Sequence, residues 1–319
     1  MSAPTVITVT LNPAIDLTVT VENLTLGTVQ RARASQTNVG GKGINVAGCL
    51  ADWGTPVLAT GILGRINVAA FAEFFAAKGI GDRFVRIDGE TRTNIKIADV
   101  ATGDTTDVNL PGPPVDHATY DSVVDTLDEE VRPGTLVVLA GSVPAGLPDR
   151  ATTDLIGLLG EMQARVVLDT SGPALAAALD APAGQLPFAV KPNREELEAW
   201  AGRLLPTTAD LVATARQLVE RGIALVVVSL GPEGALFVDA HAALAARLPP
   251  LQALSTVGAG DAMVAGLVSA LADDLDLGGT ARRAVAFASA KLGRVGPHLP
   301  SRAEVEHLAR AATVTVLDV

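Results

Sequence analysis

The fold class is decided by residues 136–169, which read LVVLAGSVPAGLPDRATTDLIGLLGEMQARVVLD. The two ends of this stretch, Leu136 to Ala140 and Val166 to Asp169, are short continuous apolar runs, as strands buried on both faces are. Between them, Asp149 to Gln163 carries apolar residues at helical spacing. A strand, a helix and a second strand in this order predict two parallel strands joined by a right-handed crossover.

The same alternation extends in both directions along the chain. Further strand patterns occur at Val6 to Leu11, Phe188 to Lys191 and Leu225 to Leu230. Helix patterns occur at Ile44 to Trp53, Asn67 to Lys78, Thr207 to Arg221 and, after a glycine turn, Ala262 to Leu271. We therefore expect an α/β fold, a three-layer α/β/α sandwich around a mostly parallel central sheet.

Two regions interrupt the alternation. Residues 12–37 and 90–110 contain short extended runs with turn residues, which predict small antiparallel strands. We interpret them as a β-sheet lid inserted into a single α/β domain that spans residues 1–319, because no long linker divides the chain. A sheet of this size cannot bury both faces alone, so we expect it to cover a ligand cleft or to pair with a second copy as a homodimer.

The composition narrows the partners and the location. Lys and Arg number 24 against 35 Asp and Glu, and the net charge of −11 argues against a nucleic acid partner. The one cysteine, Cys49, cannot form an intrachain disulfide. Because the sequence has neither a secretory leader nor a run of about 18 apolar residues, a cytoplasmic protein without a membrane segment is expected.

Several common signatures of catalytic sites are absent from the sequence. Scattered histidines disfavour a zinc site; they are His117, His241, His298 and His307. Ser142 lacks the first glycine of G-x-S-x-G, and Lys42 lacks the Ser or Thr that follows the lysine of a P-loop. Met263 stands where a dinucleotide fingerprint needs its third glycine, which makes an oxidoreductase a poor match.

The strongest motif is Ser255-Thr256-Val257-Gly258-Ala259-Gly260-Asp261, which leads directly into an apolar helix. Backbone N–H groups that converge in a glycine turn, together with the helix dipole, predict an anion hole. Asp261 is then either a helix cap or the base that accepts a proton from a hydroxyl attacking a bound phosphate. An ordinary aspartate titrates near ~3.9, so we expect Asp261 to be ionised at neutral pH without special tuning.

Two further segments suit a sugar as well as a purely structural role. Gly40-Gly41-Lys42-Gly43-Ile44-Asn45 is either a tight turn before a helix or a site where Asn45 hydrogen-bonds a polyol. Asp16 follows the first strand, at the edge where open α/β sheets bind ligands, although it also suits a turn.

Two later segments have the same ambiguity. In Lys191-Pro192-Asn193-Arg194-Glu195-Glu196, the pair Asn193 and Glu196 is either a capping box or a set of oxygen ligands for hydrated Mg²⁺. The glycines of Ser229-Leu230-Gly231-Pro232-Glu233-Gly234 suit either a hairpin turn or a close approach to nucleotide phosphates.

Taken together, these segments resemble the ribokinase-like (PfkB) carbohydrate kinase family from about Thr8 to Gly296. GGKGINVA at 40–47 and TVGAGDAMVAGL at 256–267 look like the two signature regions of that family, and KPNREEL and VSLGPEGAL are similar to its metal and nucleotide segments. Other segments are similar to its hexose-phosphate kinase branch, namely TLNPAIDLTV, TRTNIKI, DVNLPGP, LAGSVPAG and LDTSGPAL.

The resemblance implies an ATP-dependent phosphotransferase and a role for each matching residue. Asp261 is implied to be the catalytic base, with an anion hole lined by Gly258, Ala259 and Gly260. The implied substrate-binding residues are Asp16, Gly40, Gly41, Lys42, Asn45, Arg92 and Ser142. Of these, Lys42 and Arg92 are the candidates for the phosphate that the sugar already carries. The implied nucleotide-binding residues are Lys191, Asn193, Ser229, Gly231, Gly234 and Thr256, while Asn193 and Glu196 are linked to Mg²⁺ through water.

The implied reaction is phosphoryl transfer from MgATP to a free hydroxyl of a ketohexose phosphate. Fructose 1-phosphate is the favoured acceptor, with tagatose 6-phosphate and fructose 6-phosphate as alternatives. A non-catalytic sugar-phosphate sensor is the hypothesis from another class. Thr28 stands where the relatives that use fructose 6-phosphate carry a lysine, which weakens that alternative, and Gly64-Arg65-Ile66-Asn67 departs from a more usual G-x-x-G.

Overall fold

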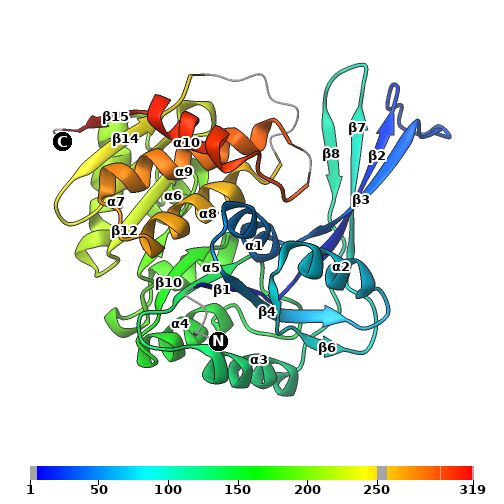
Figure 1. The fold of residues 1–319 in the computed structure, drawn as a ribbon, viewed down its shortest axis with the longest axis horizontal. Coiled ribbons are helices and arrows are strands. Elements are labelled where there is room, and N and C mark those ends of the chain that lie inside the picture. Colours follow the sequence, from blue (N-terminus) through cyan, green and yellow to red (C-terminus); the bar gives the residue numbers. More distant parts are fainter. Residues whose placement is uncertain (1–5, 250–256, 295, 318–319) are drawn as a thin grey trace.

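The computed structural model describes residues 6–249, 257–294 and 296–317, in which the chain forms a large sheet and a small sheet beside it (Figure 1). Thr256, one of the residues expected to bind nucleotide, lies outside the described residues. Within these ranges, no helix has both the length and the apolar character that crossing a membrane requires.

The large sheet has eleven strands among the described residues. Neighbouring strands are parallel from β5 to β12 and antiparallel from β12 to β15. In spatial order they are β15 (Thr313–Val316), β14 (Ala243–Arg247), β13 (Ala235–Val238), β12 (Leu225–Ser229), β11 (Ala189–Val190), β10 (Arg165–Asp169), β9 (Leu136–Ala140), β1 (Val6–Thr10), β4 (Val57–Gly64) and β5 (Gly81–Asp82), with β6 (Val85–Ile87) also paired to β4. The predicted mostly parallel sheet is confirmed. The antiparallel edge was not predicted, apart from the hairpin turn considered for Ser229 to Gly234, which joins β12 to β13.

Helices cover both faces of this sheet, because successive strand residues point to opposite sides. In β1, Val6 packs into one core cluster and Ile7 into the other. One face is covered by α1 (Lys42–Trp53), α2 (Ala69–Lys78), α8 (Ala259–Ala272), α9 (Leu277–Leu292) and α10 (Arg302–Ala311). The other is covered by α3 (His117–Glu130), α4 (Ala151–Glu161), α5 (Gly172–Leu179), α6 (Arg194–Ala201) and α7 (Thr208–Glu220). Short 3₁₀ turns, η1 (Ala183–Gln185) and η2 (Gly231–Glu233), lie in connections, and the three predicted layers are present.

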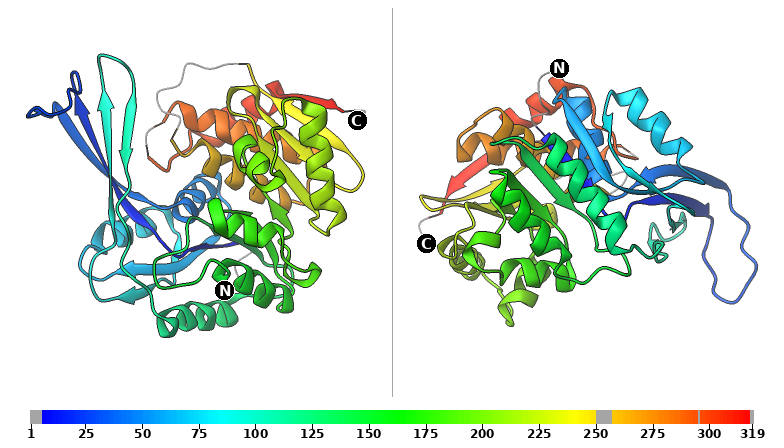
Figure 2. Two further views of the ribbon diagram at one scale, coloured as in Figure 1. Left: turned by 180° about the vertical axis from the view of Figure 1, so that it is seen from behind. Right: turned by 90° about the horizontal axis from the view of Figure 1, so that it is seen from below.

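The small sheet extends away from the α/β body in all three views (Figures 1 and 2). Its strands, in spatial order, are β3 (Ala34–Gly40), β2 (Ala14–Val21), β7 (Thr93–Asp99) and β8 (Thr105–Val108). The two regions that interrupt the alternation therefore form one sheet, as predicted. The expectation of purely antiparallel strands is wrong for its central pair, because β2 and β7 run parallel. Within the small sheet, the antiparallel pairs are β2–β3 and β7–β8, and β7 enters the sheet after the chain has passed through β4 to β6.

Candidate active site

The carboxyl ends of the parallel strands meet at one edge of the large sheet, and the candidate site lies there, as is usual for open α/β sheets. β10 ends on Asp169, β11 leads to Lys191, and β12 ends on Ser229. Two cavities open at this edge. Gly258 lines the first, and Ala259 and Gly260 line the second, so the N-terminus of α8 separates them.

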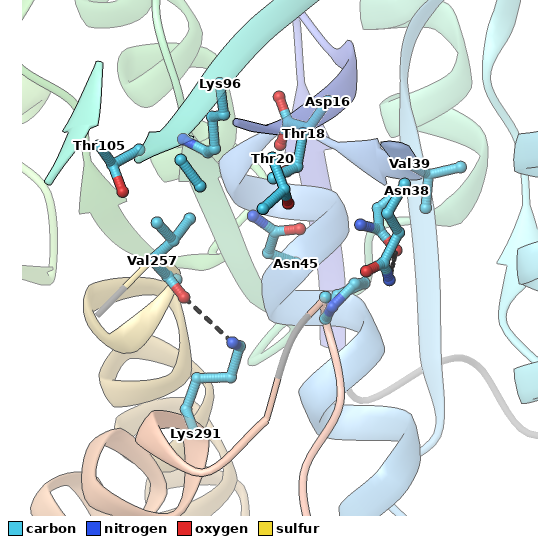
Figure 3. A pocket seen from close by; sticks show the side chains of 15 residues that line it. Asp16, Thr18, Thr20, Asn38, Val39, Asn45, Lys96, Thr105, Val257 and Lys291 are labelled. Carbon is cyan, nitrogen blue, oxygen red and sulfur yellow. Dashed lines mark hydrogen bonds between the residues drawn. The ribbon is translucent and has the colours of Figure 1, made fainter. Parts of the chain in front are cut away.

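The first cavity, of about 340 Å³, is lined mostly by residues with polar side chains and lies between the small sheet and helices α1, α8 and α9. Figure 3 shows Asp16, Thr18 and Thr20 of β2 on one side of it and Asn45 of α1 on the other. Lys96 of β7 adds a positive charge to the lining. Carboxylate, hydroxyl and amide groups around a cavity of this size suit a ligand with many hydroxyl groups. This polar cavity thus joins Asp16 and Asn45, two of the residues expected to bind sugar.

The second cavity, of about 350 Å³, is mainly apolar. Its walls come from the β12–β13 connection, which contributes Gly231 and Gly234, and from Met263 of α8 and Val285 and Leu292 of α9. An apolar slot with a few polar atoms at its mouth suits a flat nucleobase. Ser229 lines the same cavity, so three residues expected to contact nucleotide lie together in this apolar cavity.

Asp261 lies in the first turn of α8, directly after the glycine turn that separates the two cavities. The turn before it needs a glycine, because Gly258 has a backbone φ of 78°, an angle that residues with a side chain rarely adopt. Asn45 Nδ2 donates a hydrogen bond of 2.7 Å to Asp261 Oδ2. The Asp261 residue is only 8% exposed. Asn45 and Asp261 are 216 residues apart in the chain, and this contact joins the two glycine motifs found in the sequence.

Burial raises the pKa of Asp261 from 3.8 to about 6, and the negative charge of Asp169 contributes to the rise. The hydrogen bond from Asn45 and the charges of Lys42 and Lys191 oppose it. The expectation that this aspartate titrates at its ordinary value is therefore wrong. Removing the carboxylate from water raises its pKa by more than the helix N-terminus and the neighbouring lysines lower it.

A cluster of three charges, two of them buried, lies beside Asp261. Lys42 Nζ and Lys191 Nζ lie 3.2 Å and 3.3 Å from Asp169 Oδ1. Burial alone would raise the pKa of Asp169, but the two ammonium groups outweigh it and hold that pKa below its ordinary value. A Cβ built on Gly260 would lie 3.7 Å from Lys191 Nζ, so this ammonium lies against the N-terminus of α8. Asp169 therefore holds two positive charges next to the expected anion hole.

Gly40 and Asn94 fix the side chain of Asp16. A Cβ on Gly40 would lie 2.5 Å from Asp16 Oδ2, so no other residue fits there without moving the carboxylate. Across the parallel pair β2–β7, Asn94 Nδ2 donates to Asp16 Oδ1 at 3.1 Å. Gly41, the next residue, is the N-cap of α1.

Arg92 and Ser142 lie together at a different place, around Asn12. The Arg92 guanidinium donates to the main-chain oxygens of Asn12, Pro13 and Leu110. Asn12 Nδ2 donates to Ser142 Oγ at 3.0 Å. Lys42 and Arg92, the two candidates for the phosphate that the sugar already carries, thus belong to different clusters of side chains.

Asn193 and Glu196 form the capping box of α6. Asn193 Oδ1 accepts from the Glu196 backbone N–H, and Glu196 Oε2 accepts from the Asn193 backbone N–H, both at 2.8 Å. No group of three or more His, Cys, Asp or Glu that suits a metal occurs in the described part of the chain. An Mg²⁺ ion keeps most of its water shell, and one carboxylate oxygen remains after the cap is made. The pair therefore fits an ion held through water.

Sequence reasoning missed three residues of this region, namely Asp169, Asn94 and Lys291. Asp169 carried a usable signal, because a charged residue that ends a buried strand lies at the ligand-binding edge. The other two carry none, because Asn94 meets Asp16 only through strand register and Lys291 reaches the site only through the packing of α9 on α8.

A polar cavity and an apolar cavity that share a helix N-terminus, with a carboxylate between them, define a phosphotransferase with a small alcohol acceptor. The chain belongs to the pfkB family of carbohydrate kinases, whose family model matches residues 8–304. Membership confirms the resemblance read from the sequence motifs and implies ATP as the phosphoryl donor.

The relatives agree with this assignment. The chain is 51% identical over 287 residues to a 1-phosphofructokinase of Xanthomonas campestris pv. campestris, with 90% of each chain covered. It is 47% identical to the 1-phosphofructokinase of Rhodobacter capsulatus, with 97% of each chain covered. Among solved structures, phosphofructokinase-2 from Escherichia coli in complex with substrates and products matches with a TM-score of 0.89 and 31% identity, over 96% of this chain and 98% of that one.

Proposed function

We propose that this protein transfers the γ-phosphoryl group of ATP to the C6 hydroxyl of fructose 1-phosphate, which gives fructose 1,6-bisphosphate and ADP. The observation that carries the proposal is the position of Asp261, buried between the polar cavity and the apolar cavity and held by Asn45. The names of the two relatives that are 51% and 47% identical support fructose 1-phosphate as the acceptor.

In the proposed reaction, Asp16 and Asn45 bind sugar hydroxyl groups and the apolar cavity binds the nucleobase. The acceptor hydroxyl gives its proton to Asp261 while its oxygen bonds to the γ-phosphorus. The bond from that phosphorus to the bridging oxygen breaks, and ADP leaves. Backbone N–H groups of Gly258, Ala259 and Gly260 stabilise the charge on the transferred group, because donors fixed in a dry site need no reorganisation.

The charged clusters divide the two phosphates between them. Lys42 and Lys191, held by Asp169, add positive charge near the transferred group. Arg92 and Ser142 are left for the phosphate that the sugar already carries. Asn193 and Glu196 would hold Mg²⁺ through water, and the ion supplies charge neutralisation on the ATP phosphates when bound.

The small sheet is proposed to act as a lid and as the contact of a homodimer. Residues of β2, β3, β7 and β8 line the polar cavity, so movement of this sheet opens or closes it. Leu26 and Val29, in the connection between β2 and β3, are 88% and 91% exposed. Exposed apolar side chains next to a small sheet favour aggregation unless a partner covers them.

The test of the proposed function is an ADP-release screen over sugar monophosphates and their unphosphorylated parents. We expect the highest kcat/KM with fructose 1-phosphate. A clear preference for tagatose 6-phosphate or fructose 6-phosphate would contradict the proposed acceptor, while the assignment as a sugar-phosphate kinase would stand. If the small sheet is a lid that closes over the sugar and excludes water, ADP release should stay at background when no acceptor is added. Rapid ADP release without an acceptor would contradict this role of the lid.

Replacing Arg92 tests the assignment of the sugar's own phosphate. Arg92→Ala should raise KM for the sugar phosphate by the equivalent of ~1.5–3 kcal/mol, because one charge-assisted contact is lost, while KM for ATP stays nearly constant. Steady-state kinetics with each substrate varied in turn measures both. Arg150→Ala, which removes an exposed arginine that pairs with Asp154, is the control. Equal increases in both KM values would contradict this role.

A further inference from the structure

Lys291 is a buried lysine that points at the turn before α8. It lies in the last turn of α9 and is only 3% exposed. Its Nζ donates to the main-chain oxygen of Val257 at 3.0 Å and to that of Arg294 at 2.9 Å. Figure 3 shows the side chain reaching up from its helix to Val257 at the wall of the polar cavity.

The neighbours of this ammonium are carbonyl oxygens. Among the described residues, no carboxylate lies within ion-pair distance of Lys291, in contrast to Lys42, Lys78, Lys96 and Lys191. A buried charge without a counter-ion is costly, so it persists only where dipoles and hydrogen bonds replace its water. Burial lowers the pKa of Lys291, and the carboxylate of Asp261 opposes this.

The Lys291 ammonium lies directly behind the turn that begins α8. Val257 directly precedes Gly258, the N-cap of α8. A Cβ on Gly258 would lie 3.3 Å from Lys291 Cε and 3.8 Å from Nζ, so the lysine packs against the turn itself. The same ammonium ties this turn to the chain that follows α9, through Arg294.

We propose that Lys291 is a positioning residue for phosphoryl transfer: its ammonium ties Val257 to Arg294, fixes the turn that forms the anion hole, and places a positive charge behind it. The proposal rests on the proposed function of that turn. Because main-chain oxygens can also bind alkali cations, the Lys291 ammonium takes a position that a free monovalent cation could otherwise fill between these two oxygens. The protein should therefore need no added monovalent cation at this point.

The experiment compares Lys291→Met, which keeps the length of the side chain, with Lys291→Ala, which leaves space. Both variants are first assayed in a buffer whose cation is tetramethylammonium, without sodium, potassium or ammonium. The assay is then repeated with ammonium chloride or potassium chloride added. We expect kcat to fall about 10- to 100-fold in both variants, less than for a donor that touches the developing charge, with little change in KM for the sugar phosphate. Ammonium or potassium should restore kcat at least several-fold in Lys291→Ala and not in Lys291→Met. The wild type should not respond.

Lys78→Met is the matched control, because Lys78 also lies in the last turn of a helix, is largely buried, and donates to a main-chain oxygen, that of Gly48. It should lower the melting temperature with no effect of ammonium on kcat. A wild-type kcat for Lys291→Met, or a wild type that requires potassium, would overturn the inference. A wild type with no kinase activity would instead contradict the proposed function, so the two failures are distinguishable.

Discussion

Asp261→Asn is expected to lower kcat by ~10² to 10⁴ while KM for both substrates stays nearly constant. The variant keeps the shape of the side chain and an oxygen that accepts from Asn45, so both cavities keep their walls. What it loses is the group that takes the hydroxyl proton. Steady-state kinetics of ADP release gives both parameters.

The same variant should be more stable than the wild type at pH 8. The folded-state pKa of Asp261 is raised from 3.8 to about 6, so folding favours the protonated form. The stability that the protonated Asp261 contributes is at its maximum below a pH of about 3.8 and is lost as the pH rises through about 6. Asparagine never ionises, so urea unfolding at pH 8 should show a gain of up to about 3 kcal/mol.

Asp276→Asn is the control for both measurements, since Asp276 is the N-cap of the neighbouring helix α9 and asparagine caps equally well. It should leave kcat and stability nearly unchanged. An Asp261→Asn enzyme with turnover within tenfold of the wild type would contradict the role of Asp261 as the base. Lower stability at pH 8 would contradict the raised pKa.

Much of the fold is predictable because it depends on local pattern. The continuous apolar strands predicted burial on both faces, and residues such as Val6 and Ile7 do pack into separate core clusters. The glycine turn before a helix predicted the α8 N-terminus, because only a few residue types permit that turn. The antiparallel edge β13 to β15 escaped prediction. The alanines of β14 carry a weak strand signal, whereas the β-branched residues of β15 carry a strand signal that we missed.

The sequence allowed many residues of the site to be predicted, but not how they are arranged in space. Asn45 and Asp261 were both chosen from sequence, yet their contact joins positions 216 residues apart. The charged cluster around Asp169 forms across 127 residues, so no local pattern reports it. The pKa of Asp261 depends on burial, which exists only in the assembled fold.

Asp169→Asn should cost about 3–5 kcal/mol of stability, because it leaves two lysines beside each other without their counter-charge. The value should lie at the low end, since the Lys42 side chain is 37% exposed. Urea unfolding at pH 7 measures it. A loss of stability is also what the pKa of Asp169 predicts, because folding holds that pKa below its ordinary value. The stability that the ionised Asp169 contributes is therefore present at pH values above the ordinary pKa and is lost in acid.

The same substitution should shift the pH profile of the enzyme. The wild type should lose kcat/KM below a pH of about 6, where Asp261 takes up a proton before substrate binds. The charge of Asp169 is one cause of that raised pKa, so removing it should move the acid limb to lower pH. Asp52→Asn breaks another partly buried ion pair, with Lys78, away from the cavities. It should lower stability without moving the acid limb, because Asp52 is not among the groups that shift the pKa of Asp261. An acid limb that stays in place in Asp169→Asn would show that the two carboxylates do not interact, and burial alone would then have to account for the pKa of the base.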